Sequence, residues 1–359
     1  MPLDNYVSLG RSALRVSPFT LGAMTFGEDS GWGCSPEEAG AMMDEYLARG
    51  GNVIDTANIY TNGHSEKIIG DYLAARPGLR DRLIISTKFV CNLFPGDPNG
   101  GGAGRKAIVK QAEESLRRLQ TDYLDLYWVH QWDRTAPIDE TMRALDDLVT
   151  AGKIRYIGLS DLPAWKVTEA QLIADFRGWN PAIALQAEYS LLARTVENEH
   201  VAMARHLGLG IMPWSPLRNG FLSGKFSRTR KGPVDATRTA MTGEPADSDY
   251  DVIDVLETVA AEVGVSPAAA ALSWVQNRPG VTSTLIGARR LAQLKDNLDA
   301  IDVRLTADQT AALDKVSAPP LSFPAAYETL ARDLMFGGAT VDGVASEMSP
   351  LLGSGSVRY

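Results

Sequence analysis

The sequence contains only two cysteines, Cys34 and Cys91, among its 359 residues. Two cysteines cannot build a disulfide framework, and no Cys-x-x-Cys spacing suggests a zinc site. We therefore expect both thiols to behave as small apolar side chains in a protein of a reducing compartment. We expect no metal.

The chain also lacks an excess of positive charge. Its 35 lysines and arginines are outnumbered by 44 aspartates and glutamates, which gives a net charge of -9, and no basic run occurs. These features are unlike those of a general nucleic-acid or membrane-surface binder. They do not exclude a small ligand, or a ligand that a local patch of charge attracts.

Long apolar runs are missing as well. Stretches such as Ala268–Val275 are far shorter than the roughly 18 residues of a transmembrane span. The first ten residues carry Asp4 and Asn5 in place of the basic and apolar parts of a secretory signal. We therefore expect a cytoplasmic protein without a membrane-spanning segment.

What is present is a globular composition, with 45% apolar and 22% charged residues. This length suits about two domains, although a single α/β barrel often runs as long. Short β-type runs alternate with helical runs, and the expected strands begin near Phe19, Asn52, Leu83, Tyr123, Ile154, Ile183, Gly210 and Val281. Their spacing is close to that of strand-helix-strand units. Eight such units predict an α/β fold, a single (β/α)8 TIM barrel over residues 1–317.

Helix start and stop signals support this alternation. Ser35 and Glu38 form a capping-box pattern, in which the serine accepts an early backbone N–H and the glutamate reaches back. Thr306 and Gln309 repeat the pattern late in the chain. The segment 139–151 places apolar residues on one face at three-residue steps, as a helix does.

Three stretches rich in Gly, Pro or Ser break the rhythm, at residues 92–104, 215–248 and 318–359. Long loops after barrel strands lie at the C-terminal mouth, so the first two are candidate lids, with disordered linkers as the alternative. We expect 318–359 to be a C-terminal extension that either folds over the mouth or is partly disordered. Residues 6–16 predict an N-terminal hairpin at the barrel floor.

Polar or aromatic side chains recur where the expected strands end. They are Asp55, Lys88, His130, Ser160, Asp161, Gln186 and Trp214. A barrel brings the C-terminal ends of its strands into one ring, so these residues converge on one site. Each alone has an ordinary structural explanation, as a cap, a solvent-reaching lysine or a core histidine. Their occurrence together favours a catalytic or binding site over these separate structural roles.

Four residues form a set that can protonate a carbonyl oxygen. A buried Lys88 needs a partner, and Asp55 at the end of the neighbouring strand supplies one. Tyr60 follows on the next loop, where a charged Lys88 is expected to lower the phenol pKa. His130 can hydrogen-bond a substrate oxygen from the other side.

Phosphate-binding motifs are absent. No G-x-G-x-x-G follows a strand, and the glycine-rich segments near Gly100 and Gly220 lack the Gly-Lys-Ser/Thr ending of a phosphate loop. This argues against a two-domain nucleotide-binding dehydrogenase. A barrel hydrolase with paired carboxylates is another alternative, and it would need Asp161 as the second acid beside Asp55.

These residues resemble those of the aldo-keto reductases. The resemblance covers roughly residues 9–316 and is strongest in Asp55-Thr56-Ala57 with Tyr60, the segment 65–70 (SEKIIG), Lys88, and His130 closing LDLYWVH. It implies NADPH-dependent reduction of an aldehyde or ketone, a small-molecule carbonyl substrate. Tyr60 would be the proton donor, His130 would orient the carbonyl oxygen, and the Asp55–Lys88 pair would tune Tyr60.

The resemblance also implies where the cofactor binds. Trp214 corresponds to the platform under the nicotinamide ring, and Ser160 and Gln186 to partners of its carboxamide. The implied cofactor residues are Ala23, Met24, Asp55, Tyr60, Ser160, Asp161, Gln186, Trp214, Ser215, Pro216, Leu217, Arg218, Asn219, Gly220, Lys225, Arg238, Gly287, Arg289, Gln293, Asp296 and Asn297.

Asp161 departs from the family pattern, because many members have Asn there. An ionised Asp only accepts hydrogen bonds, whereas Asn also donates. Its alternative role is the N-cap of the helix that Pro163 opens. Arg289, Arg290 and Arg238 favour NADPH over NADH, because guanidinium groups pair well with a ribose phosphate, and surface solubility is their alternative role.

Three aromatic residues, Phe26, Trp32 and Trp132, are expected to line an aromatic substrate pocket, with core packing as the alternative. The family also includes channel-associated members, so an NADP-binding regulatory or sensor subunit with little turnover is the alternative function. The absence of an evident partner-binding extension argues against it. The substrate, the reaction direction and the oligomeric state stay open.

Overall fold

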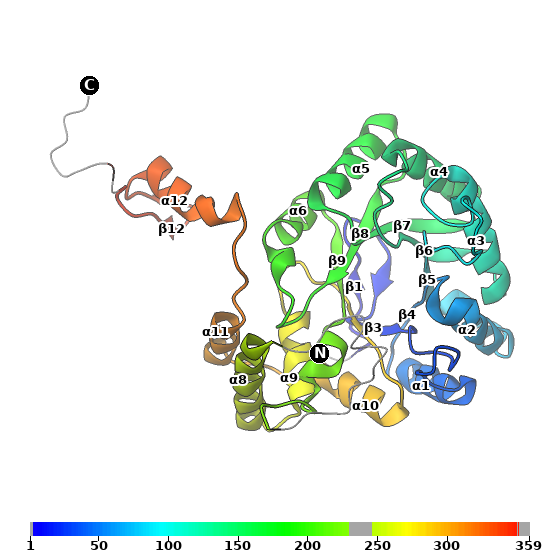
Figure 1. Ribbon diagram of the computed structural model, residues 1–359, viewed down its shortest axis with the longest axis horizontal. Coiled ribbons are helices and arrows are strands. Elements are labelled where there is room, and N and C mark those ends of the chain that lie inside the picture. Colours follow the sequence, from blue (N-terminus) through cyan, green and yellow to red (C-terminus); the bar gives the residue numbers. More distant parts are fainter. Residues whose placement is uncertain (1–2, 230–245, 350, 352–359) are drawn as a thin grey trace.

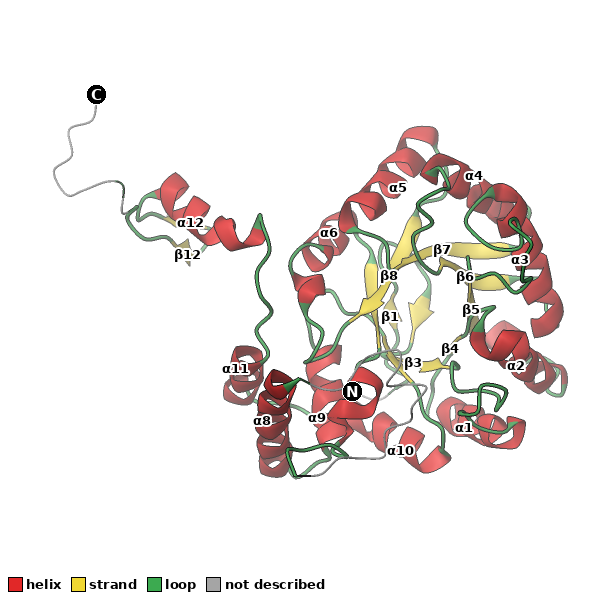
Figure 2. Cartoon of the chain, viewed as in Figure 1, coloured by secondary structure: helices red, strands yellow, loops and turns green. Residues whose placement is uncertain are grey.

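The computed structural model describes residues 3–229, 246–349 and 351. Eight parallel strands form one sheet in the order β10-β3-β4-β5-β6-β7-β8-β9, and helices surround it (Figures 1 and 2). The barrel strands are β3 (Phe19–Gly22), β4 (Val53–Asp55), β5 (Ile84–Phe89), β6 (Leu124–Val129), β7 (Ile154–Ser160), β8 (Ala182–Glu188), β9 (Gly210–Trp214) and β10 (Thr284–Ile286).

The barrel closes between the first and last strands of this order. Ile211 in β9 donates its N–H to the Gly280 carbonyl at 3.1 Å and accepts from the Thr282 N–H at 2.8 Å. The expected (β/α)8 barrel is therefore confirmed. Seven strands begin within one residue of the expected positions, and the eighth begins at Thr284 instead of near Val281.

The described helices follow the strands around the barrel. The α-helices are α1 (Pro36–Ala48), α2 (His64–Ala74), α3 (Arg105–Leu119), α4 (Ile138–Thr150), α5 (Ala164–Arg177), α6 (His200–Leu207), α8 (Asp247–Val263), α9 (Pro267–Gln276), α10 (Leu291–Asp299), α11 (Ala307–Val316) and α12 (Ala325–Phe336). The 3-10 helices are η1 (Tyr60–Gly63), η2 (Arg80–Arg82), η3 (Thr195–Glu197), η4 (Arg218–Ser223) and η5 (Ala300–Asp302).

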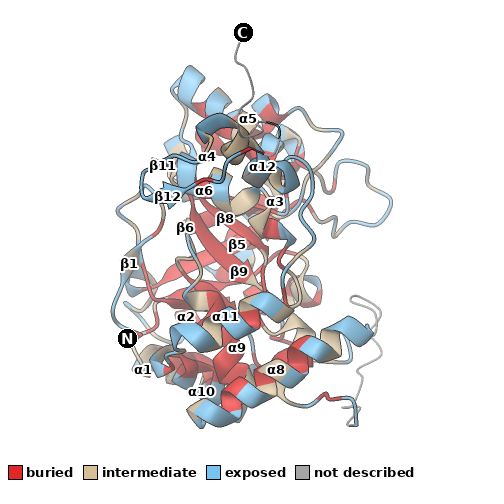
Figure 3. Cartoon of the chain, turned by 90° about the vertical axis from the view of Figure 1, so that its left-hand side faces the viewer, coloured by how far each residue is buried: buried red, intermediate tan, exposed pale blue. Residues whose placement is uncertain are grey.

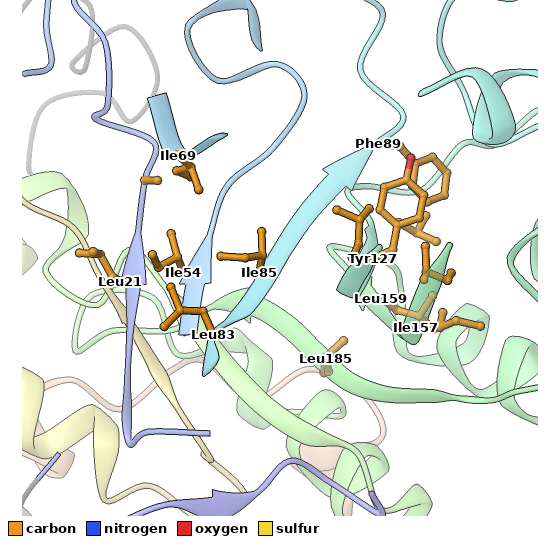
Figure 4. Close-up of a cluster of buried hydrophobic side chains, with 14 of the residues drawn as sticks. Leu21, Ile54, Ile69, Leu83, Ile85, Phe89, Tyr127, Ile157, Leu159 and Leu185 are labelled. Carbon is orange, nitrogen blue, oxygen red and sulfur yellow. The ribbon is translucent and has the colours of Figure 1, made fainter. Parts of the chain in front are cut away.

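The core has two layers, because successive side chains of a strand point to opposite faces of the sheet. Outward-facing residues such as Ile54, Ile85 and Tyr127 pack against the helices (Figure 4). Inward-facing residues such as Trp128 fill the barrel itself. Most strand residues are accordingly buried, while the helices keep an exposed outer face (Figure 3).

The expected hairpin at the barrel floor is confirmed. The strands β1 (Val7–Ser8) and β2 (Arg15–Val16) pair antiparallel, and Leu9 joins the cluster inside the barrel with no exposed surface. Gly10 has φ +55°, and a Cβ there would lie 2.2 Å from the Ile183 carbonyl oxygen. The loop of this hairpin therefore lies so close to β8 that only glycine fits at this position.

One of the two expected capping boxes is complete. Thr306 accepts from the Gln309 N–H at 3.2 Å, and Gln309 accepts from the Thr306 N–H at 3.0 Å. Ser35 does accept from the Glu38 N–H, at 3.3 Å. The expectation for the Glu38 side chain is wrong, because it accepts from the Leu291 N–H at 2.5 Å and so ties α1 to the start of α10.

The three irregular stretches have different outcomes. Residues 92–104 contain no helix or strand. The stretch 215–248 contains η4 and the start of α8, and its residues 230–245, with Arg238, lie outside the described part.

The loop expectation for 318–359 is wrong over α12, whose sequence is rich in strong helix formers such as Ala and Leu. A hairpin of β11 (Thr340–Val341) and β12 (Val344–Ala345) follows it. This extension lies beside the barrel and does not cover its mouth (Figures 1 and 2). No single described helix is long and apolar enough to cross a membrane, and α8 and α9 meet that test only as a pair bent by 96°.

Candidate active site

Four sequence-predicted residues come together at the carboxyl ends of neighbouring strands. Asp55 is the last residue of β4, Lys88 is the penultimate residue of β5, and His130 directly follows β6. Tyr60 begins η1 on the loop that leaves β4. The parallel pairing of β4, β5 and β6 places these ends side by side.

Asp55 and Lys88 form a buried ion pair, with exposed fractions of 1% and 0%. Lys88 Nζ also donates to the Thr56 carbonyl oxygen at 2.8 Å. Burial alone would lower the pKa of Lys88, but the negative charge of Asp55 and the nearby Tyr60 hydroxyl outweigh burial and raise this pKa. Lys88 is therefore held as a cation.

Asp55 is held from its other side by two further donors. Ser86 Oγ donates to Asp55 Oδ1 at 2.6 Å, and Gln186 Nε2 donates to the same oxygen at 3.4 Å. Ser86 was missed from the sequence. It lies two residues before Lys88 on β5, and this spacing places both side chains on the same face of the strand.

Tyr60 lies directly beside the lysine. Lys88 Nζ donates to the Tyr60 hydroxyl at 3.2 Å and lies 4.8 Å from the ring centre. Lys88 does lower the pKa of the Tyr60 phenol, but the expectation that this pKa is lowered overall is wrong. Burial raises the pKa of Tyr60 more than the positive charge of Lys88 lowers it. The phenol is therefore protonated at neutral pH and has a cation next to its oxygen.

His130 completes the group of four. Its ring lies edge-on to that of Tyr60, with centroids 5.9 Å apart and an interplanar angle of 83°. Its Nδ1 is 3.8 Å from Cys91 Sγ. Burial, together with the nearby Lys88 cation, lowers the pKa of His130 to about 3. His130 is thus a neutral imidazole at physiological pH, with one N–H donor and one acceptor.

A second group lies at the ends of β7, β8 and β9. Trp214, the last residue of β9, donates its indole N–H to Asp161 Oδ1 at 3.0 Å. The N-cap role considered for Asp161 is wrong, because α5 begins at Ala164 with Pro163 as its N-cap. Asp161 has φ +54°, and its own N–H donates to the Gln186 carbonyl at 3.2 Å.

Ser160 leaves hydrogen-bonding capacity unused in this second group. It is 1% exposed, and its Oγ makes no well-formed hydrogen bond within the described residues. It lies near enough to Asp161 to contribute to lowering the pKa of that carboxyl. Because a buried hydroxyl normally has a partner, Ser160 can hydrogen-bond a polar group of a ligand at this end of the barrel.

The loop after β9 has an unusual backbone. Ser215, Arg218 and Asn219 have φ of +52°, +46° and +53°. The Asn219 N–H donates to Ser215 Oγ at 3.3 Å. Arg218 forms an ion pair with Glu188. The implied cofactor loop 215–220 is thus held in a conformation that non-glycine residues rarely adopt.

The residues expected at the adenosine end lie together on the loop after β10 and on α10. Arg289 donates its backbone N–H to Gln293 Oε1 at 3.1 Å, and Asn297 Nδ2 donates to the Gly287 carbonyl at 3.3 Å. Asp296 is exposed on the same helix.

The remaining expected cofactor residues lie on other elements. Ala23 and Met24 follow β3, where Ala23 is buried and Met24 is exposed. Lys225 is exposed beyond η4, next to the buried Phe226. Ala23 and Met24, residues 215–220 and the loop after β10 thus follow the carboxyl ends of β3, β9 and β10.

The three aromatic pocket candidates differ in position. Phe26 is fully buried in the core, so it offers no surface to a substrate. Trp32 is partly exposed on the loop after β3. Trp132 is partly buried and packs edge-on against Trp165, with ring centroids 5.5 Å apart. Two of the three therefore have surface to offer to a ligand.

The part of the chain that the structure describes contains no group of three or more His, Cys, Asp or Glu side chains that could hold a metal ion. The two candidate carboxylates of a hydrolase are also engaged otherwise, Asp55 with Lys88 and Asp161 with Trp214.

A closed (β/α)8 barrel with an acid-base set at the carboxyl ends of its strands defines the chain as a barrel enzyme. The chain belongs to the Aldo/keto reductase family, whose sequence model matches residues 18–318. It is an oxidoreductase that acts on a small molecule, as the names of its relatives also indicate.

Three relatives illustrate the similarity. An uncharacterized oxidoreductase of Bacillus subtilis is 37% identical over 309 residues, which cover 84% of this chain and 92% of the relative. Norsolorinic acid reductase B of Aspergillus parasiticus is 35% identical over 336 residues, covering 90% and 86%. An aryl-alcohol dehydrogenase of Pestalotiopsis microspora is 33% identical over 320 residues, covering 87% and 82%.

Proposed function

We propose that this protein reduces an aldehyde or ketone to an alcohol with NADPH, and that Tyr60 is the proton donor. The observation that carries this proposal is the position of the Tyr60 hydroxyl, 3.2 Å from the Nζ of a fully buried Lys88 that is paired with Asp55. Such a phenol is protonated before the reaction, and its anion is stabilised afterwards.

Each residue of this set has a separate task. The neutral His130 donates an N–H to the carbonyl oxygen and orients it beside Tyr60. Tyr60 transfers its hydroxyl proton to that oxygen, and the adjacent Lys88 cation stabilises the phenolate that forms. Asp55 holds Lys88 in place and keeps it charged. A nicotinamide cofactor, when bound, would supply the hydride for the carbonyl carbon.

The residues at the ends of β7 to β9 support a nicotinamide cofactor. The buried Ser160 hydroxyl has a free hydrogen-bonding position within the described residues, and Gln186 Nε2 makes only a long bond of 3.4 Å. Both groups suit a carboxamide, and the half-buried indole of Trp214 at the end of the next strand, β9, suits an aromatic ring.

The preference for NADPH over NADH rests on Arg289 and Arg290 at the start of α10. Arg290 is exposed and the neighbouring Arg289 is partly exposed, and a guanidinium group pairs well with a ribose phosphate. A cytoplasmic location remains a prediction from the composition.

The decisive variant is Tyr60→Phe, which removes one hydroxyl and keeps the ring. We expect the rate of NADPH oxidation with a reactive aromatic aldehyde to fall by about 10²-fold or more, while NADPH binding is retained. Tyr6→Phe is the matched control, because its hydroxyl bonds the Gly50 carbonyl near the N-terminal hairpin. A Tyr60→Phe enzyme as fast as the wild type would refute the proton-donor role.

The same assay distinguishes the alternative of a regulatory subunit. Tight NADPH binding by the wild type, with no turnover across aromatic aldehydes, dicarbonyls, sugars and cyclic ketones, would favour that alternative.

The cofactor preference needs its own variant. Arg289→Ala should lower the ratio of kcat/KM with NADPH to kcat/KM with NADH by about tenfold or more, the value of a charged hydrogen bond. Arg155→Ala is the control, since Arg155 is exposed near the amino end of β7, at the opposite end of the barrel. An unchanged ratio would exclude Arg289 as the phosphate ligand.

A further inference from the structure

Asp161 places a carboxylate at the mouth where the resembling enzymes often have a neutral amide. The residue directly follows β7, and its Oδ1 accepts the indole N–H of Trp214 at 3.0 Å. Its backbone is fixed in the left-handed region, with φ +54° and an N–H bond to the Gln186 carbonyl. The carboxylate is therefore held at the edge of the Trp214 ring.

The charge of Asp161 is not neutralised locally. Within the described residues, no lysine, arginine or histidine forms an ion pair with it. Lys88 is paired with Asp55, and Arg218 is paired with Glu188. The partners of Asp161 are neutral donors, so its negative charge acts on whatever lies against Trp214.

The proposed cofactor differs in charge between its two redox states at this place. The nicotinamide ring is cationic when oxidised and neutral when reduced. A fixed carboxylate beside the ring attracts only the oxidised form by Coulomb interaction. An asparagine would keep the acceptor for Trp214 but would carry no charge.

We propose that Asp161 is a specificity-determining residue that makes this site favour oxidised over reduced nicotinamide cofactor. The inference rests on the proposed function, because it takes the nicotinamide to lie against Trp214. Its consequence is that bound NADPH is a stronger hydride donor than it would be beside an asparagine, because the carboxylate stabilises the cationic ring that hydride loss would leave. The equilibrium between the bound reactants is thereby biased toward carbonyl reduction, the direction of the proposed function.

The test is equilibrium binding of NADP+ and of NADPH at pH 8, followed by tryptophan fluorescence and by calorimetry, without any substrate. Asp161→Asn should shift the ratio of the two dissociation constants by about threefold to tenfold toward NADPH, the range for one charge pair at a partly exposed site. Asp161→Asn preserves the bond to Trp214, so a purely structural role for Asp161 leaves this ratio unchanged.

Asp133→Asn is the matched control. Asp133 lies on the loop after β6, where its carboxylate accepts the backbone N–H groups of Ala103 and Thr135. It should leave the ratio within twofold of wild type.

A second arm uses pH. Burial raises the pKa of Asp161 to about 6 although the side chain keeps contact with solvent. Three groups act on it electrostatically from neighbouring elements, namely Lys88, Tyr60 and Glu188, and Glu188 is paired with Arg218. The pKa values of Lys88 and Tyr60 are raised and that of His130, which lies beside Tyr60, is about 3, so Lys88, Tyr60 and His130 keep their charge between pH 8 and pH 5. The wild-type ratio should therefore approach that of Asp161→Asn at pH 5.

Two results overturn the inference and are distinguishable. Wild-type protein that binds both cofactor forms, with a ratio that Asp161→Asn changes by less than twofold, refutes the role of Asp161 and leaves the proposed function intact. Wild-type protein that binds neither form refutes the proposed function itself.

Discussion

Replacing Lys88 with methionine removes the cation from a buried ion pair and leaves the carboxylate of Asp55 behind. Asp55 is 1% exposed, so water cannot take the place of the lysine. Its remaining partners are Ser86 Oγ at 2.6 Å and Gln186 Nε2 at 3.4 Å, and neither carries a charge. The variant therefore buries an uncompensated negative charge.

The expected cost follows from this burial. Breaking a buried ion pair by removing one partner costs about 3–5 kcal/mol of unfolding free energy, because the other charge stays desolvated. Removing both charges, in Asp55→Asn with Lys88→Met, should cost at least about 2 kcal/mol less than the sum of the two single variants. A solvent-exposed pair gives the contrast. Lys67 and Asp71 lie 2.6 Å apart on α2 with exposed fractions of 59% and 54%, so Lys67→Met should cost no more than about 0.5 kcal/mol.

The assay is equilibrium urea unfolding, followed by tryptophan fluorescence and far-ultraviolet circular dichroism, with coincidence of the two curves as the condition for reading a free energy. The reasoning is refuted when Lys88→Met costs less than about 1 kcal/mol, or when the double variant is additive. Either result would mean that water or backbone movement solvates Asp55.

Two further predictions concern glycines and pH. Gly158→Ala should cost about 1–3 kcal/mol of unfolding free energy, because a Cβ there would lie 2.2 Å from the buried ring of Trp128; Gly40→Ala, with no atom within 4 Å inside α1, should instead add about 0.5–1 kcal/mol. Equal effects in urea unfolding would contradict the barrel packing. His130 has a folded pKa of about 3 against 6.5 for an unperturbed histidine, so below pH 6.5 the unfolded chain binds a proton that the folded protein does not, and stability falls as the pH drops toward 3. Wild type should lose about 1–2 kcal/mol more than His130→Gln between pH 7 and pH 5; equal losses would show that His130 is solvated.

Much of the fold was readable from local pattern. The strand starts at Phe19, Ile154 and Gly210 were placed to the residue, because a buried strand in a parallel barrel is a short apolar run with turn signals around it. The capping box of Thr306 and Gln309 also formed as expected, since both of its hydrogen bonds are made within four residues of chain.

The convergence of Asp55, Lys88 and His130 was equally accessible. Each residue stands at the C-terminal end of an expected strand, and a closed barrel leaves only one place where those ends meet. A residue's position along its strand therefore already decided on which end of the barrel it would lie.

The remaining features depend on which segments become neighbours across the barrel. Glu38 bonds Leu291, 253 residues away, in place of its own helix. Phe26 is buried where a pocket wall was expected, and Asp161 anchors Trp214 instead of capping α5. The pKa of Tyr60 rises because the burial around the phenol outweighs one neighbouring charge.

The spacing of apolar residues thus specified the barrel, and the polar residues at the strand ends specified which side chains form its site. Both patterns can be read from short segments of the chain. Hydrogen-bond partners, burial and protonation states were decided by the tertiary structure. These properties depend on the distances between residues that the sequence keeps far apart, and on how much protein excludes water around each group.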